Sequence, residues 1–315
     1  MSLNTLVKLA GAAGIAVGGA ALANAAVAAA APALDEWFEA EHASYFWHGH
    51  RLSYAVRGSG RPVLLVHGIH AAASSYEWRH NFETLSQTYR VHALDLLGFG
   101  LSDRPATRYS AEMYVSLLVD FLRDVFSEPP AVVASSLSCA YAVVAAHRAP
   151  QHVSDLVLVC PTGMRRVVRA WAPLETMVES SLEIPVVGQS LFNVLVSEAS
   201  IRFFLKDQVF GSEDAIDDAI VKQMYATSHQ PGARHAPAAF VGGTLDQPID
   251  ELFARVQTPM MLVFGSKARL TPSTDAEYFT AANPAVRVEV ADGAGLLPHD
   301  ERPGWFNGIV AEFLG

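Results

Sequence analysis

The chain has little cysteine and little charge. Only two of its 315 residues are cysteines, Cys139 and Cys160, and 17% of the residues are charged. No zinc-type cysteine spacing, phosphate-binding P-loop or dinucleotide fingerprint occurs, so we expect neither a metal nor a cofactor. Both thiols are predicted to be buried and unpaired, because free cysteine packs as a small hydrophobic residue. A disulfide between them would need neighbouring Cα atoms, which a sequence does not establish.

Positive charge is also in short supply. The chain has 22 Lys and Arg against 32 Asp and Glu, which gives a formal net charge of -10. No basic stripe offsets this charge, which argues against nucleic acid as a partner. Hydrophobic residues make up 51% of the chain, enough for a substantial core and too many for a disordered protein. The length suits one large α/β domain with an insertion, or two ordinary domains.

Residues 9–34 form an apolar run rich in Ala and Gly that ends at Asp35. The run exceeds the roughly 20 residues of a membrane span, although Ala and Gly are only weakly apolar. Residues 1–34 therefore suggest either a signal peptide, with a cleavage option at Ala23–Ala25, or an uncleaved membrane anchor. We expect a membrane-anchored or exported (periplasmic or extracellular) protein, with a flexible cytosolic tail as the alternative.

Beyond Asp35, short apolar runs alternate with helix-like segments. Continuous apolar runs such as Pro62–Val66 are typical of buried parallel strands. Strands that alternate with helices predict an α/β fold, a mostly parallel sheet with helices on both faces. Strands are expected at 44–48, 52–56, 62–66, 90–94, 131–134, 156–160, 260–264 and 286–290, and helices at 75–88, 111–126, 136–147 and 305–314.

The hydrophobic pattern of the sequence changes between residues 164 and 255. Strand-like runs vanish there, and apolar residues recur at helical spacing, as in Leu191, Val194 and Leu195. This pattern predicts a helical insertion that covers the sheet as a cap. The chain is then divided into a first core part at 35–163, the cap at 164–255 and a second core part at 256–315.

The segment Val132–Ser138 carries the strongest chemical signal. It predicts a buried strand that turns sharply into a helix with Ser136 at the corner, the arrangement called a nucleophile elbow. Ala134 and Ser138 supply the small neighbours that such a crowded turn requires. A serine hydroxyl still needs a base for its proton and donors for the developing oxyanion. The alternative is that the serines of this segment are simply small packing residues.

A second loop follows the strand at 62–66 and reads His67-Gly68-Ile69-His70. We expect the backbone N–H groups of Ile69 and Leu137 to form the oxyanion-binding pair, and His67 to brace the loop through hydrogen bonds. The Gly-rich turn at 95–105 is interpreted as structural, because its glycines relieve backbone constraints.

Four motifs follow one another in a family order: "LLVHG" at 64–68, "DLLGFGLSDRP" at 95–105, "VVASSLS" at 132–138 and "GAGLLPHDERP" at 293–303. With them, residues 45–315 resemble the α/β-hydrolase superfamily, of the capped, serine-dependent, esterase-like kind. The resemblance implies an eight-stranded sheet, a cap over a pocket, and acyl or related chemistry at Ser136.

The resemblance fails at two decisive positions. In the family an acid follows the seventh strand and a histidine follows the eighth, but here Ala268 and Leu296 stand at these places. Leucine can neither accept the serine proton nor return it to a leaving group. Loss of the triad histidine costs on the order of a millionfold in kcat. The sequence therefore predicts a degenerate triad.

Two histidines are candidate substitutes for the missing base. His299 lies three residues after Leu296 and shares its face if the turn is helical, although it could instead bond the backbone or pair with Asp300 or Glu301. His70 lies beside the predicted oxyanion loop and could reach over the pocket, line it, or lie at the surface. The run 77–79 is interpreted as helix packing with an ion pair.

Three functional hypotheses remain open. The first is a serine hydrolase that acts through Ser136 on a hydrophobic ester, thioester or amide with an incomplete or relocated triad. The second is a non-catalytic relative that holds a lipid or another small hydrophobic ligand in the capped pocket. The third is an isomerase, lyase or cyclase that uses the oxyanion site without hydrolysis. Each implies a small hydrophobic partner, and the N-terminus adds membrane association.

Overall fold

The computed structural model describes residues 3–164, 181–182 and 184–315. In this part of the chain, eight strands form one sheet in the order β1-β2-β4-β3-β5-β6-β7-β8. The strands are β1 (Glu41–Trp47), β2 (His50–Arg57), β3 (Pro62–Val66), β4 (Arg90–Leu94), β5 (Ala131–Ser135), β6 (Asp155–Val159), β7 (Met260–Gly265) and β8 (Arg287–Ala291).

Strand β2 runs antiparallel to both of its neighbours, and the other pairs are parallel. This is the mostly parallel, eight-stranded sheet of the α/β-hydrolase fold, so the predicted fold class is confirmed. Each strand that the sequence predicted is present, with boundaries shifted by a few residues at most.

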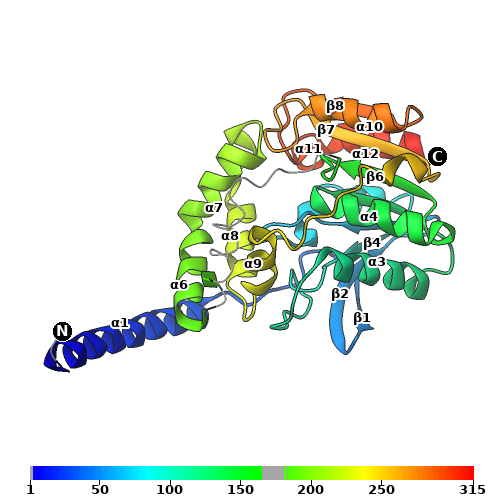
Figure 1. Cartoon of the computed structure of the whole chain (residues 1–315). Coiled ribbons are helices and arrows are strands. Elements are labelled where there is room, and N and C mark those ends of the chain that lie inside the picture. Colours follow the sequence, from blue (N-terminus) through cyan, green and yellow to red (C-terminus); the bar gives the residue numbers. More distant parts are fainter. Residues whose placement is uncertain (1–2, 165–180, 183) are drawn as a thin grey trace.

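The helices lie on both sides of the sheet and in an insertion between β6 and β7 (Figure 1). They are α1 (Leu3–Ala30), α2 (Phe82–Leu85), α3 (Ala111–Val125), α4 (Leu137–Arg148), α6 (Pro185–Leu195), α7 (Glu198–Phe204), α8 (Asp218–Ser228), α9 (His235–Val241), α10 (Ala276–Ala282), α11 (Pro298–Glu301) and α12 (Pro303–Leu314), together with short turns that include η1 (Ser75–Trp78) and the π-helical η3 (Leu205–Val209).

Alternation along the strands divides the core into two layers. On β5, Val132 and Ala134 belong to a cluster that also contains apolar residues of α3, α4 and α10. The intervening Val133 belongs to a second cluster with residues of α2 and α12. Successive side chains of a strand point to opposite faces, so a strand buried on both faces must be apolar throughout. This explains the unbroken apolar runs in the sequence.

The insertion between β6 and β7 is helical, as the sequence predicted, and α6 to α9 stand beside the sheet as a separate layer (Figure 1). Its buried side chains include Ile201, Leu205, Ile220 and Met224, which pack on one another and on Leu297. Residues 165–180 and 183 of the predicted cap lie outside the described residues. The cap boundaries at 164 and 255 therefore stay a prediction.

The predicted helix at 75–88 is wrong as a single element. The structure has the short helices η1 and α2 instead, and Asn81 between them has a φ of -116°. The Asn81 side chain donates hydrogen bonds to the carbonyl oxygen of His299 and to Asn307 Oδ1, at 3.0 and 2.9 Å. These tertiary contacts favour an interruption that helical periodicity does not reveal.

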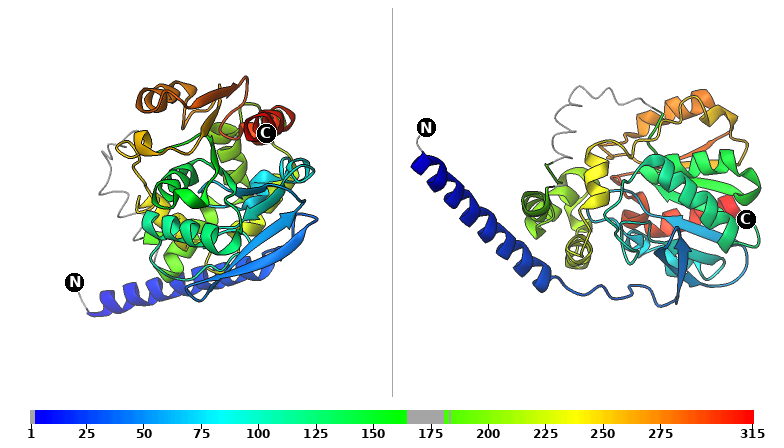
Figure 2. Two further views of the ribbon diagram at one scale, coloured as in Figure 1. Left: turned by 90° about the vertical axis from the view of Figure 1, so that its right-hand side faces the viewer. Right: turned by 60° about the horizontal axis from the view of Figure 1, so that its bottom comes forward.

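Helix α1 projects from the body of the molecule in both views of Figure 2 and packs on α6 near its end. The Asn24 side chain joins the two helices, because it donates to Val186 O at 3.0 Å and accepts from Ser190 Oγ at 3.1 Å. Within the described stretches of the chain, we find no helix with the length and apolarity that a bilayer crossing demands. That finding lends no support to the predicted membrane anchor or signal peptide. The cellular location stays a prediction.

Candidate functional site

Ser136 occupies a sharp corner between β5 and α4. Its φ is 53° and its ψ is -123°, a conformation that costs a non-glycine residue free energy and that clusters at functional sites. The Ser136 N–H donates to Val159 O at 2.8 Å, which ties the corner to the neighbouring strand β6. The backbone here therefore has the strained geometry of a nucleophile elbow.

A cavity of about 700 Å³ lies over this corner, between the sheet and the cap. Ser136 lines it from the sheet side. Its volume lies in the range of small-molecule binding sites. The cap contributes a wall that is almost entirely apolar, with Phe203, Phe204, Ile220, Met224 and Phe240 among its residues.

Ala268 and Leu296, the positions predicted for the triad acid and histidine, lie together beside this cavity. Together with Cys160 they form a small buried apolar cluster, and Leu296 also lines the cavity. The loops that carry them are still joined, because the Lys267 N–H donates to Ala294 O at 2.8 Å. The assignment of these two positions to the triad acid and histidine stays a prediction.

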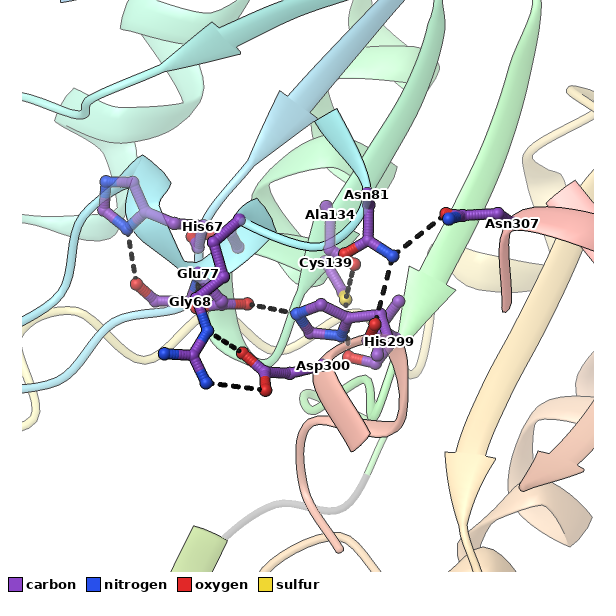
Figure 3. A network of polar contacts seen from close by, with 12 residues as sticks. His67, Gly68, Glu77, Asn81, Ala134, Cys139, His299, Asp300 and Asn307 are labelled. Carbon is purple, nitrogen blue, oxygen red and sulfur yellow. Dashed lines mark hydrogen bonds and ion pairs between the residues drawn. The ribbon is translucent and has the colours of Figure 1, made fainter. Parts of the chain in front are cut away.

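His299, the first candidate base, lies behind the elbow and outside the cavity lining. Its imidazole is fully buried, packs on the Trp78 ring at 4.3 Å between centroids, and has Nε2 3.4 Å from Glu77 Oε1 (Figure 3). Neither ring nitrogen forms a hydrogen bond with a described residue, so this imidazole does not hold the Ser136 hydroxyl.

The alternative in which His299 pairs with Asp300 or Glu301 is not what the structure has. Asp300 instead accepts two hydrogen bonds from Arg79, at 2.9 and 3.1 Å, and Glu301 accepts from the backbone of Gly211. These partners orient α11 so that its histidine faces η1. Both charged residues of the run 77–79 have partners in α11: Arg79 pairs with Asp300, and Glu77 contacts His299.

Glu77 is the polar residue of the site that the sequence interpretation missed. Its carboxylate is buried yet borders the cavity, and Oε2 accepts the Gly68 N–H at 2.9 Å. Burial acts to raise the pKa of Glu77, but its contact with His299 and the neighbouring Ser135 hydroxyl outweigh this effect and hold the pKa at about 2. No local signal in the sequence marks Glu77, because its position depends on contacts with the 67–70 loop and with α11.

His70, the second candidate base, lines the cavity at the end of the 67–70 loop. Its Nδ1 accepts the Ala72 N–H at 3.3 Å, and its ring lies 5.9 Å from the Phe204 ring of the cap. Burial lowers the pKa of His70 to about 4, against a smaller opposing effect of Glu77. The residue is therefore a neutral part of the cavity wall at pH 7, and a catalytic role for it stays a prediction.

His67 and the Gly-rich turn have the structural roles that were predicted. The His67 Nδ1 donates to Gly68 O at 2.6 Å, and its Nε2 accepts the Leu96 N–H at 3.1 Å, which assigns the tautomer. Asp95 caps the turn by accepting the N–H groups of Ser75 and Leu101. These contacts brace the loop that approaches Ser136.

Ile69 and Leu137, the predicted oxyanion donors, flank the elbow. Ile69 lines the cavity, and Leu137 is the first residue of α4, directly after Ser136. The first N–H groups of a helix have no partner within it and are available to an anion. Their role stays a prediction. Cys139 and Cys160 are both buried and free, as predicted, so the disulfide alternative is excluded.

Comparison with known proteins identifies the family. A family model described as "Alpha/beta hydrolase family" matches residues 63–309. The chain belongs to the α/β hydrolase family. Its relatives include an uncharacterized protein of Mycobacterium tuberculosis strain H37Rv, 27% identical over 274 residues, which are 85% of this chain and 79% of the relative. Another relative is the 2-hydroxy-6-oxo-6-(2'-aminophenyl)hexa-2,4-dienoic acid hydrolase of Metapseudomonas resinovorans, 26% identical over 72% of this chain and 74% of the relative.

Solved structures of hydrolases share the fold. A meta-cleavage product hydrolase of Pseudomonas fluorescens IP01 superposes with a TM-score of 0.72 at 23% identity, over 86% of this chain and 97% of that one. A bacterial membrane phospholipase A superposes with a TM-score of 0.69 at 21% identity, over 99% of this chain and 96% of that one. At these identities the likeness concerns the fold alone.

Proposed function

We propose that this α/β hydrolase family member binds a small hydrophobic molecule in the cavity over Ser136 and does not hydrolyse it through an ordinary triad. The observation that carries the proposal is the apolar cluster of Cys160, Ala268 and Leu296. Ala268 and Leu296 are the positions predicted for the triad acid and histidine, and none of the three side chains carries a carboxylate or an imidazole. Cys160 offers no substitute base, because burial raises the pKa of its thiol to about 11.

The size of the catalytic loss favours binding over turnover. Without a triad histidine, about 10³–10⁴ of the rate acceleration over water remains, from the oxyanion site and binding alone. The cavity itself keeps the volume and apolar wall that a lipophilic ligand requires. Burial of apolar ligand surface contributes roughly 25 cal/mol per Å², so binding does not depend on the missing groups.

Slow hydrolysis of a hydrophobic ester, thioester or amide at Ser136 is the second candidate. The strained backbone of Ser136 supports it, because such geometry is a cost without benefit in a purely structural turn. The relative that bears the name of a dienoic acid hydrolase supports it as well. In this candidate His70, which lines the cavity, would be the relocated base.

A fluorophosphonate probe separates the two candidates. The proposed binding protein leaves the probe unreacted, and an organic extract of the purified chain contains a lipophilic molecule detectable by mass spectrometry. The variant Ser136→Ala is the matched control for labelling. Labelling of the wild type that the variant abolishes, together with turnover of short p-nitrophenyl esters, would overturn the proposal in favour of hydrolysis.

A further inference from the structure

The mouth of the cavity is apolar on its outer side as well. Among the described residues, five large apolar side chains both line the cavity and are exposed to solvent: Leu195, Phe203, Phe240, Val241 and Leu270. They come from α6, α7, α9 and the loop after β7, and we call them the apolar rim. Exposed apolar side chains therefore surround the entrance to an apolar cavity.

The apolar rim continues along one face of α6. Ile184, directly before this helix, and Val187, Leu191 and Val194 within it are exposed as well. Their spacing of three and four residues puts them on one face of the helix, and Leu195 of the rim shares that face. We call the rim and this face together the apolar cap surface. Contiguous exposed apolar surface of this kind marks a site of interaction with a protein or a membrane.

The charges beside the apolar cap surface neutralise one another. None of its nine side chains is charged, and the cations that adjoin the rim in sequence are paired with acids: Arg202 with Asp218, Lys206 with Glu213 and Arg269 with Asp207. Helix α1, which packs on α6, adds no charge, because residues 9–34 contain none. A strongly charged partner therefore gains little electrostatic attraction here, and an uncharged apolar partner is favoured.

The continuity of the surface with the cavity favours lipid as that partner. A protein that covered the rim would also close the cavity. A lipid bilayer covers the rim and at the same time holds apolar molecules of the kind that the cavity accommodates. An apolar molecule that enters from the bilayer avoids the free-energy cost of passing through water.

We propose, on the basis of the ligand-binding function above, that the apolar cap surface docks on a bilayer of neutral lipid and that the cavity takes its ligand directly from this bilayer. The exposed face of α6 and the rim lie against the acyl chains at the bilayer surface, and the mouth of the cavity opens toward them. Docking of this kind needs no helix that spans the membrane.

Sedimentation of the full chain with phosphatidylcholine vesicles tests the docking. The wild type is expected to bind, with an affinity that changes by less than about twofold between 0.1 and 0.5 M NaCl, because the contact is uncharged. The double variant Leu191→Ser with Val194→Ser should weaken vesicle binding about tenfold or more. Neither residue lines the cavity, so the affinity for 1-octanol in solution, measured by isothermal titration calorimetry, should stay unchanged.

A matched pair of phenylalanines tests the position of the contact. Phe203 belongs to the rim and Phe46 to the edge strand β1, which lies apart from α6 and α7 (Figure 1), and both are 68% exposed. Phe203→Ser should weaken vesicle binding about fivefold or more, and Phe46→Ser should leave it unchanged. An equal loss in both variants would contradict a specific docking surface. Urea denaturation checks that each variant is folded.

The outcomes separate this inference from the function on which it rests. Absence of vesicle binding, or equal binding by the wild type and the α6 double variant, overturns the docking surface and leaves ligand binding intact. A dimer that this variant loses in light scattering, with unchanged vesicle binding, would assign the surface to a second copy of the chain instead. Failure to bind 1-octanol, in a protein whose extract also contains no lipophilic molecule, overturns the ligand-binding function and the transfer from the bilayer together.

Discussion

The two sides of Ser136 differ in kind. Toward the loops after β7 and β8, the neighbours are aliphatic or a buried thiol: Ala268, Leu296 and Cys160. Toward η1 and α11, they are a carboxylate and an imidazole, Glu77 and His299, also fully or almost fully buried. Glu77 and His299 are therefore ionisable groups that pair with each other, and neither forms a hydrogen bond with the Ser136 hydroxyl in the described part of the chain.

This difference shows that ionisable groups can be buried and paired in this molecule without taking part in catalysis. A buried carboxylate is expensive unless it is paired, and His299 supplies that pairing on the polar side. On the apolar side nothing requires compensation, so that half of the site contributes only packing. A hydrolase needs the opposite distribution, with the ionisable groups aligned on the serine.

The largest effect is expected when ionisable residues replace Ala268 and Leu296 on the apolar side of Ser136. The double variant Leu296→His with Ala268→Asp puts an imidazole and an acid into a backbone frame whose loops are already joined. We expect hydrolysis of p-nitrophenyl butyrate to rise by a factor of about 10² or more over the wild type, since a positioned general base contributes about 10²–10⁴. Addition of Ser136→Ala should abolish the gain. A folded double variant with the wild-type rate would show that the frame no longer supports a triad.

A second test removes the contact between Glu77 and His299 on the polar side of Ser136. His299→Leu leaves the Glu77 carboxylate buried without its partner and should lower the free energy of unfolding by about 3–5 kcal/mol. Urea denaturation measures this change. The further replacement Glu77→Met should recover most of the loss, because both ionisable groups are then absent. Strictly additive effects of the two replacements would mean that the residues are not coupled.

The smallest effect concerns His70, which belongs to neither side. Burial lowers its pKa to about 4 from a model-peptide value of 6.5, so the unfolded chain binds the proton more readily between these pH values. Stability should therefore fall as the pH drops from 6.5 to 4, and part of this fall should vanish in His70→Gln. Urea unfolding over this range, with the exposed His48→Gln as control, measures the difference. Solvent keeps the effect small, since the His70 side chain is partly exposed. An unchanged profile in His70→Gln would indicate that the ring is solvated.

Much of the fold follows from local patterns. Apolar runs mark β3 and β5 because both faces of these strands are buried, and small residues mark the elbow because the turn is crowded. The interrupted segment at 75–85 could not be predicted in this way. Its break depends on Asn81, whose partners His299 and Asn307 are more than 200 residues distant in sequence.

Some features of the candidate site could also be predicted from the sequence, and others could not. The corner serine and the substitutions at Ala268 and Leu296 were predicted from motif order, because each lies at a characteristic place after a strand. The contact of His299 with Glu77 was not predicted, because Asp300 and Glu301 are nearer in sequence and carry the same charge. Arg79 and the backbone of Gly211 take these two acids, and only the packing of α11 on η1 decides which residue the imidazole faces.

The amino-acid sequence alone determined the eight-stranded sheet and the helical insertion, because apolar periodicity is a local property. The absence of an acid and a histidine from the triad positions stays a prediction from residue identity. The tertiary structure alone decided that Glu77 borders the cavity and that His299 stands behind it. Burial and pairing of charges depend on contacts between distant segments, and neither helical spacing nor motif order encodes those contacts.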